Sequence, residues 1–156
     1  MINRKGFLRV LGSLGCAAAV LFSGQAAAAE CDVEVSVGDT LAFSTKSIEV
    51  PSSCETVTVK LTHTGSMAKN LMGHNWVLTQ EADLQAVATA GMTAGVDGNY
   101  LPEGDARVLA ATDLIGGGES ASVSFASADL EAGKSYAFFC SFPGHWAVMR
   151  GTFKLV

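Results

Sequence analysis

Hydrophobic and polar residues alternate in short segments along most of the chain, a pattern typical of β-strands with one buried face. The clearest case is residues 56–63, where one face carries Val57, Val59, Leu61 and His63. Similar alternation recurs at residues 32–37, 74–79, 120–125, 136–140 and 153–155. Glycine and serine clusters separate these segments. Many short strands joined by turns predict an all-β domain, a β-sandwich or barrel of about eight strands.

One segment departs from this two-residue period. Residues 81–92 place Leu84, Val87, Ala88 and Met92 at the spacing of one helical face. Acidic residues stand near the start of the segment, and Thr79 is a candidate N-cap. The pattern predicts one short helix outside the sandwich. The sequence shows no internal repeat, linker or second domain.

Residues 1–29 have the pattern of a cleaved signal peptide. Three basic residues, Arg4, Lys5 and Arg9, precede an apolar run over 10–22 and four alanines at 26–29. The run is shorter than the ~20 residues that a membrane-spanning helix needs, so no stable membrane anchor is expected. We therefore predict one mature domain at residues 30–156. The basic start also resembles a twin-arginine signal, so the choice between that route and general secretion stays open.

Export changes the charge balance. The chain has 10 basic and 15 acidic residues, and three of the basic residues lie in the segment that is removed. The mature domain then keeps 7 basic and 15 acidic residues, a net charge of −8. Such an acidic domain is a poor partner for nucleic acid, because phosphate binding requires a basic face.

Three cysteines remain after Cys16 leaves with the signal: Cys31, Cys54 and Cys140. In an oxidising compartment two of them are expected to pair. A Cys31–Cys54 bridge would link two early strands and stabilise the domain by roughly 3 kcal/mol in the chain-entropy model. Cys140 would then be the free thiol, although the sequence does not exclude the other two pairings.

Residues 136–151 contain candidate metal ligands in the order C-x4-H-x3-M: Cys140, His145 and Met149. A thiolate, an imidazole and a thioether together suit copper, and a second imidazole would complete a His2Cys site with a weak axial Met. His74, far upstream in GHNW, is the candidate for that position. If these residues lie at strand ends, they can meet at one pole of a sandwich.

Three stretches carry a close resemblance to a known family: KNLMGHNWVL at 69–78, LIG at 114–116 and FFCSFPGH at 138–145. With them, the chain resembles the bacterial azurins, which are blue copper proteins of the cupredoxin family. The resemblance extends over the whole mature domain. It implies a Greek-key β-sandwich with one short helix outside it, and the Cys31–Cys54 bridge also fits the family.

The resemblance also implies the site. His74, Cys140 and His145 would hold one copper ion in a plane, with Met149 and the Gly73 carbonyl on the two axial sides. The backbone amides of two further residues, Asn75 and Phe142, would donate to the Cys140 sulfur.

By the same resemblance the protein would be a periplasmic one-electron carrier, a monomer and not an enzyme. Expected partners are c-type cytochromes or a copper nitrite reductase, docking at an apolar patch around His145. Its expected members are Leu41, Met67, Leu71, Met72, Phe142, Gly144, Ala147 and Val148. A copper enzyme needs an open coordination position or a second metal, and a copper-delivery protein needs a labile site; neither suits four fixed ligands.

Two further residues, His63 and Trp146, are not predicted to bind the metal. His63 lies among inward-facing valines and is expected to be a buried, hydrogen-bonded histidine that does not bind the metal. Trp146 has two alternatives: it fills a groove in its own domain, or it lies at the rim of the apolar patch and contacts a partner.

Overall fold

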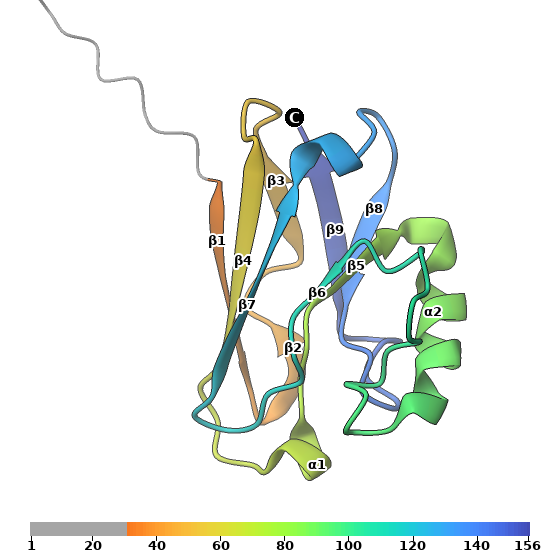
Figure 1. The fold of residues 1–156 in the computed structure, drawn as a ribbon. Coiled ribbons are helices and arrows are strands. Elements are labelled where there is room, and N and C mark those ends of the chain that lie inside the picture. Colours follow the sequence, from red (N-terminus) through yellow and green to blue (C-terminus); the bar gives the residue numbers. More distant parts are fainter. Residues whose placement is uncertain (1–30) are drawn as a thin grey trace, which may run out of the picture.

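The computed structural model describes residues 31–156, so the predicted signal peptide lies outside the described residues. Two β-sheets pack face to face as a sandwich, and the helix α2 lies outside them (Figure 1). The first sheet has the order β2-β1-β4-β7, and the second has the order β3-β9-β8-β5-β6. This all-β sandwich confirms the predicted fold class.

The first sheet consists of β1 (Asp32–Gly38), β2 (Thr40–Phe43), β4 (Thr56–His63) and β7 (Ser120–Ala126). The second consists of β3 (Ser47–Val50), β5 (Val77–Gln80), β6 (Ala110–Ala111), β8 (Tyr136–Phe139) and β9 (Arg150–Leu155). β1 pairs with β4, and β3 with β9, in parallel, while the other pairs are antiparallel. The chain therefore crosses repeatedly between the sheets rather than running as simple hairpins.

Alternation within the strands builds the main core between the sheets. In β4 the buried face carries Val57, Val59, Leu61 and His63, as the sequence pattern predicts. Aromatic rings fill the centre: Trp76 stacks on Phe138 with ring centroids 5.8 Å apart, and Phe153 meets Trp76 edge-on at 6.3 Å. These large side chains are fully buried, so each removes a large apolar area from water.

The helix α2 (Leu84–Gly91) is flanked by the 3-10 turns η1 (Glu81–Asp83) and η2 (Met92–Ala94). Its buried residues pack with Val77, Ala137 and Phe139 into a second, smaller core. The prediction that Thr79 caps this helix is wrong: Thr79 lies inside β5 and is fully buried, and Asp83 is at the N-cap position. The strand pairing of β5 therefore overrides the local capping preference of threonine.

Some short elements were not predicted. β2, β3 and β6 have four residues or fewer, and the helix α1 (Lys69–Met72) has only one turn. The residues around these elements do not continue an alternating pattern, as those around the four-residue strands β5 and β8 do. A third 3-10 turn, η3 (Ser127–Asp129), follows β7.

The predicted disulfide is present, with Cys31 and Cys54 joined just before β1 and β4. It lies at the end of the sandwich where the chain terminates, opposite α1 (Figure 1). Over residues 31–156, no helix has the length and hydrophobicity needed to cross a membrane.

Candidate metal centre

The predicted ligands come from two loops at the α1 end of the sandwich. His74 follows α1 and forms an isolated bridge with Ile115, with N–O distances of 3.0 and 2.8 Å. Cys140 directly follows β8, and His145 lies in the loop that leads to β9. The sequence predicted a strand over residues 74–79. That prediction is wrong for residues 74–76, because β5 begins only at Val77.

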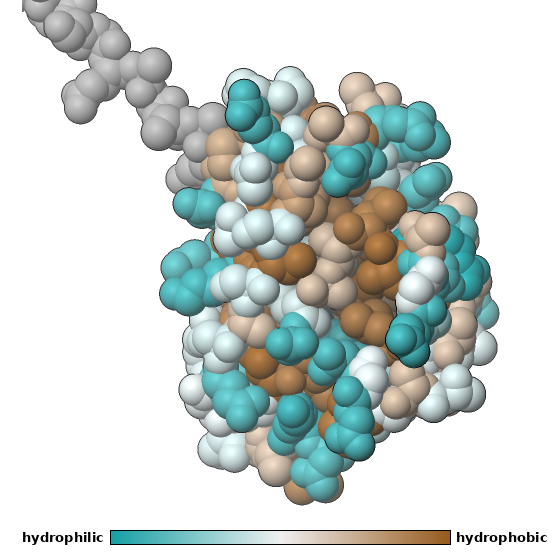
Figure 2. Space-filling model, in the orientation of Figure 1, coloured by the Kyte–Doolittle hydropathy of each residue, from teal (hydrophilic) through white to brown (hydrophobic). Residues whose placement is uncertain are grey.

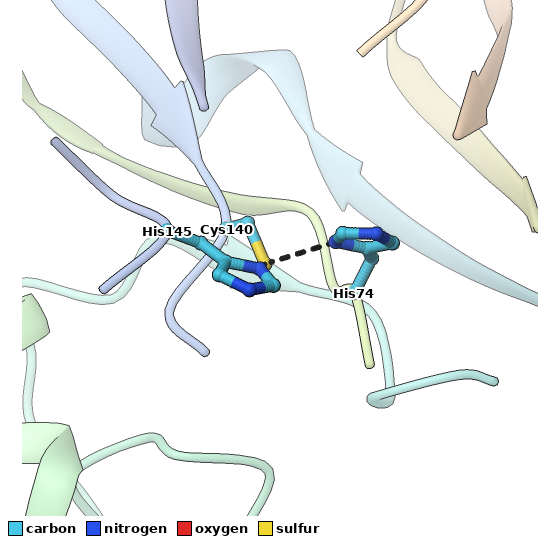
Figure 3. A group of neighbouring side chains, drawn as sticks. All are labelled: His74, Cys140 and His145. Atoms are coloured by element: carbon cyan, nitrogen blue, oxygen red, sulfur yellow. Dashed lines mark hydrogen bonds between the residues drawn. The ribbon is translucent and has the colours of Figure 1, made fainter. Parts of the chain in front are cut away.

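The side chains of His74, Cys140 and His145 point toward one another (Figure 3). One ligand atom from each lies within 4.8 Å of the others. The Cys140 sulfur is 3.7 Å from Nδ1 of His74 and 3.6 Å from Nδ1 of His145. In the part of the chain that the structure describes, this is the only such cluster of three or more His, Cys, Asp or Glu residues. The exposed fractions are 0%, 0% and 5%, so the cluster is closed to bulk water.

A backbone contact orients His74. Its Nε2 lies 3.0 Å from the carbonyl oxygen of Gly38, the last residue of β1. A carbonyl only accepts, so Nε2 carries the proton and Nδ1 keeps its lone pair toward Cys140. The His145 ring packs against Phe142 with centroids 4.5 Å apart. Both imidazoles are therefore oriented by protein groups outside the cluster.

Two further predicted groups lie beside this cluster. The Gly73 carbonyl oxygen is 3.9 Å from the Cys140 sulfur. Met149 is buried in the same core cluster as Cys140, and its carbonyl accepts from the Cys140 N–H at 3.1 Å. A side chain at residue 73 would place its Cβ 2.3 Å from the Lys69 carbonyl, so the backbone approach there requires glycine.

Burial controls the proton on the thiol. Removal from water raises the pKa of Cys140 to about 12, against the opposing effect of the backbone N–H groups of Asn75 and Phe142. These two amides donate toward the sulfur, as the resemblance implied. In the protein without a metal, Cys140 is therefore a neutral thiol at pH 7.

Burial has the opposite effect on the charge of the imidazoles. It lowers the pKa of His74 to about 4, with the Gly38 carbonyl acting against it, and it lowers the pKa of His145 below its ordinary 6.5. Both rings are neutral at pH 7 and offer nitrogen lone pairs. One soft sulfur and two imidazoles that are already neutral fit a copper ion.

Neither His63 nor Trp146 belongs to the cluster, although the His63 ring packs against His74 with centroids 5.1 Å apart. His63 is buried, with Nε2 3.1 Å from the Met72 carbonyl and Nδ1 accepting from the Gly65 N–H at 3.1 Å. Both of its nitrogens are thus occupied by backbone partners. Trp146 is partly buried and packs against the smaller core beneath α2, which favours the first of its two alternatives.

Sequence reasoning named the backbone amide of Asn75 but missed a network of side-chain hydrogen bonds behind the ligands. Asn75 and Ser141, each next to a ligand, share hydrogen bonds with one another and with the carbonyl of Asn99. Asn99 stands 24 residues from Asn75 and 42 from Ser141, and nothing in its local pattern marks it. Only the glycine-rich turn around it, VDGNY, signals an unusual backbone.

This sandwich and its buried sulfur–imidazole cluster are found in a known family. The profile of the copper binding proteins of the plastocyanin/azurin family matches residues 29–156. The chain belongs to this family, and its site holds copper.

Named relatives agree. The chain is 55% identical to azurin of Bordetella pertussis over 150 residues, covering 96% of this chain and 99% of that protein. It is 57% identical to azurin of Pseudomonas fluorescens biotype A over 124 residues, covering 80% and 97%. A solved azurin, Az-iso2 of the obligate methylotroph Methylomonas sp. strain J, superimposes with a TM-score of 0.79 at 50% identity, covering 82% of this chain and 99% of that one.

Proposed function

We propose that this protein is a periplasmic one-electron carrier with a single type 1 copper site. The observation that carries the proposal is the closed cluster of Cys140, His74 and His145, assembled from two loops that the sandwich fixes. When bound there, copper supplies a Cu(II)/Cu(I) couple. Met149 and the Gly73 carbonyl are the further groups that would hold the ion.

The residues favour electron exchange through rigidity. The Gly38 carbonyl holds His74 in one tautomer, and the amides of Asn75 and Phe142 hold the sulfur in place. Cys140 gives up its thiol proton when it acts as a ligand, whereas the neutral imidazoles bind without losing one. Because no ligand needs to move between the two oxidation states, transfer requires little rearrangement.

The same closure argues against an enzyme. Catalysis at copper requires an open position for a substrate. Here every proposed ligand is buried, and no second such cluster occurs among residues 31–156. A copper-delivery role would need a labile site, which two loops fixed by the sandwich oppose.

The proposed docking surface is the apolar patch around His145. Six large hydrophobic side chains are exposed among the described residues, and four belong to the patch: Leu41, Met67, Leu71 and Val148, with exposed fractions of 41%, 37%, 62% and 61%. On the face shown in Figure 2, a few hydrophobic atoms lie at the tip of the end where α1 lies, below more hydrophilic residues. A small apolar surface suits brief contacts with redox proteins such as c-type cytochromes or a copper nitrite reductase, and a monomer between contacts.

The test is copper titration of the mature domain. We expect one Cu(II) per chain, an intense blue absorption, and loss of that colour on mixing with a reduced c-type cytochrome. Cys140→Ser should fold and bind Cu(II) without the intense band, because the sulfur-to-copper transition is gone. A blue band that survives in Cys140→Ser, or a wild-type protein that cannot exchange electrons, would refute the proposal.

Location has its own test. Osmotic-shock release of the protein, followed by N-terminal sequencing, should find a periplasmic chain beginning near residue 30. Retention with the spheroplasts would contradict the predicted export.

A further inference from the structure

The turn at residues 95–101 has an unusual backbone. Asn99 and Tyr100 have φ angles of 57° and 51°, and they are the only non-glycine residues with positive φ in the described chain. The turn is closed by its own hydrogen bonds, from the Asn99 N–H to the Val96 carbonyl at 3.1 Å and from the Tyr100 N–H to the Gly95 carbonyl at 2.9 Å. Among residues with a side chain, asparagine tolerates this left-handed region best.

This backbone conformation places the Asn99 carbonyl within hydrogen-bond distance of both ligand loops. The Asn99 oxygen accepts from Nδ2 of Asn75 at 3.0 Å and from Oγ of Ser141 at 3.1 Å. Asn75 in turn accepts from the Ser141 N–H at 2.8 Å and donates to its hydroxyl at 2.8 Å. Asn75 follows His74 in the chain, and Ser141 follows Cys140. A single acceptor therefore closes the network that joins the two ligand segments.

The Asn99 side chain makes a third link. Its Oδ1 accepts from the Leu114 N–H at 3.0 Å, and its Nδ2 donates to the Asp113 carboxylate at 3.1 Å. Leu114 precedes Ile115, whose backbone pairs with His74. Asn99 thus contacts both Asn75, which follows His74 in the chain, and the segment around Ile115, which pairs with His74.

The neighbouring Tyr100 extends the contact to the remaining imidazole. Its ring meets Phe142 edge-on with centroids 5.2 Å apart, and Phe142 packs on His145. The turn therefore contacts a neighbour of each residue in the sulfur–imidazole cluster. Asn99 bonds to the residues that follow His74 and Cys140 in the chain, and Tyr100 packs on the ring that contacts His145.

We propose that Asn99 is a positioning residue of the copper site: its left-handed backbone places the carbonyl that fixes the spacing between the His74 and Cys140 loops. The inference rests on the proposed copper function. The carbonyl needs the backbone conformation and not the side chain, so the two contributions can be separated by mutation. Glycine keeps the conformation and loses the side chain, whereas valine disfavours the conformation.

The experiment compares Asn99→Gly, Asn99→Ala and Asn99→Val with Asp97→Val, an exposed control in the same turn. Three quantities are measured: the amide hydrogen exchange of Ser141 in the metal-free protein, the ligand-field spectrum of the Co(II)-substituted protein, and the copper EPR hyperfine coupling with the reduction potential. We expect Ser141 exchange to rise at least tenfold in Asn99→Val, with altered Co(II) and copper spectra, and less in Asn99→Ala. Asn99→Gly should melt earlier but keep the wild-type spectra, and Asp97→Val should match the wild type throughout.

The proposal is overturned if Asn99→Val, or Asn99→Ala where the valine variant does not fold, melts earlier with unchanged Ser141 exchange and unchanged spectra. It is also overturned if Asn99→Gly alters the spectra as much as Asn99→Ala does. Failure of the proposed copper function can be told apart from failure of this inference. In the first case the wild-type protein would lack the blue spectrum, but Ser141 exchange would still report on the Asn75–Ser141–Asn99 network.

Discussion

The two ends of the sandwich use cysteine in opposite ways. At one end Cys31 and Cys54 form a disulfide before β1 and β4, with a Cα–Cα distance of 5.7 Å. At the other end the same two strands finish at Gly38 and His63, and the free thiol of Cys140 lies buried between imidazoles. One end is joined covalently, and the other is held by hydrogen bonds and packing.

The difference follows from what each sulfur has to do. A disulfide restricts the unfolded chain, but a sulfur bonded to a second sulfur cannot become a thiolate, the form that binds a metal. Cys140 must stay a single sulfur that can lose a proton, so its end of the sandwich needs another means of rigidity. The Asn75–Ser141–Asn99 network and the Gly38–His74 contact provide it without occupying the sulfur. Complete burial also keeps Cys140 away from other thiols.

Removing the disulfide is expected to have the largest effect on stability and none on the site. Its sequence separation of 23 corresponds to roughly 3 kcal/mol in the chain-entropy model. The Cys31→Ala/Cys54→Ala protein should therefore melt roughly 10 °C lower. Its copper EPR spectrum should match the wild type, since the ligands lie at the other end. A changed spectrum would show that the two ends are coupled.

Features that depend on neighbouring residues in the sequence could be predicted at both ends of the sandwich. Alternation in β4 and the helical spacing in α2 identify their buried faces because each side chain's environment follows from its neighbours in sequence. The motif C-x4-H-x3-M brings its own residues together for the same reason. For the disulfide, the sequence left three pairings of the cysteines open and the resemblance favoured Cys31–Cys54; the pairing of β1 with β4, which brings the two residues together, was not predicted.

What could not be predicted depends on contacts between distant loops. Asn99 contributes through a carbonyl, which every residue possesses, and Gly38 orients His74 in the same way. Thr79 was misassigned as a helix cap because the pairing of β5 with β8 is not visible in the local sequence. Trp146 was left between two alternatives, since its neighbours beneath α2 are remote in the chain.

Substitution of Trp146 tests whether side-chain packing also stabilises the metal end. It is partly buried against the core under α2, so Trp146→Ser should destabilise the domain by about 2 kcal/mol, roughly half the cost of removing a fully buried Trp. Thermal unfolding measures this change, and Trp146→Phe is the matched control, expected to restore most of it. Electron exchange with a c-type cytochrome should be unaltered; a slower exchange with unchanged melting would instead make Trp146 a docking residue.

The free thiol predicts a pH dependence that the disulfide cannot have. Burial raises the pKa of Cys140 to about 12, lowers that of His74 to about 4 and lowers that of His145 below 6.5, so at pH 7–8 the thiol is protonated and both imidazoles are neutral. Metal uptake must then release one proton, and the apparent affinity for Zn(II) should rise about tenfold per pH unit. Indicator-dye titrations with Zn(II) measure the proton release. Cys140→Ser should release none, and release of two protons would show that an imidazole is protonated beforehand.

The smallest effect is expected at Thr79, between the two ends. Its hydroxyl is fully buried in β5, and with the Trp76 indole nitrogen it is one of two buried side-chain polar atoms without a hydrogen-bond partner in residues 31–156. A buried hydroxyl without a partner loses its hydration and regains nothing, and valine has nearly the same shape. Thr79→Val should therefore leave stability unchanged or raise it by up to about 1 kcal/mol, as measured by urea unfolding. Thr112→Val is the contrasting control, because the Thr112 hydroxyl accepts from the backbone N–H of Trp76 at 3.0 Å and its loss should destabilise the domain. A destabilised Thr79→Val protein would reveal a partner for that hydroxyl and remove the distinction between the two threonines.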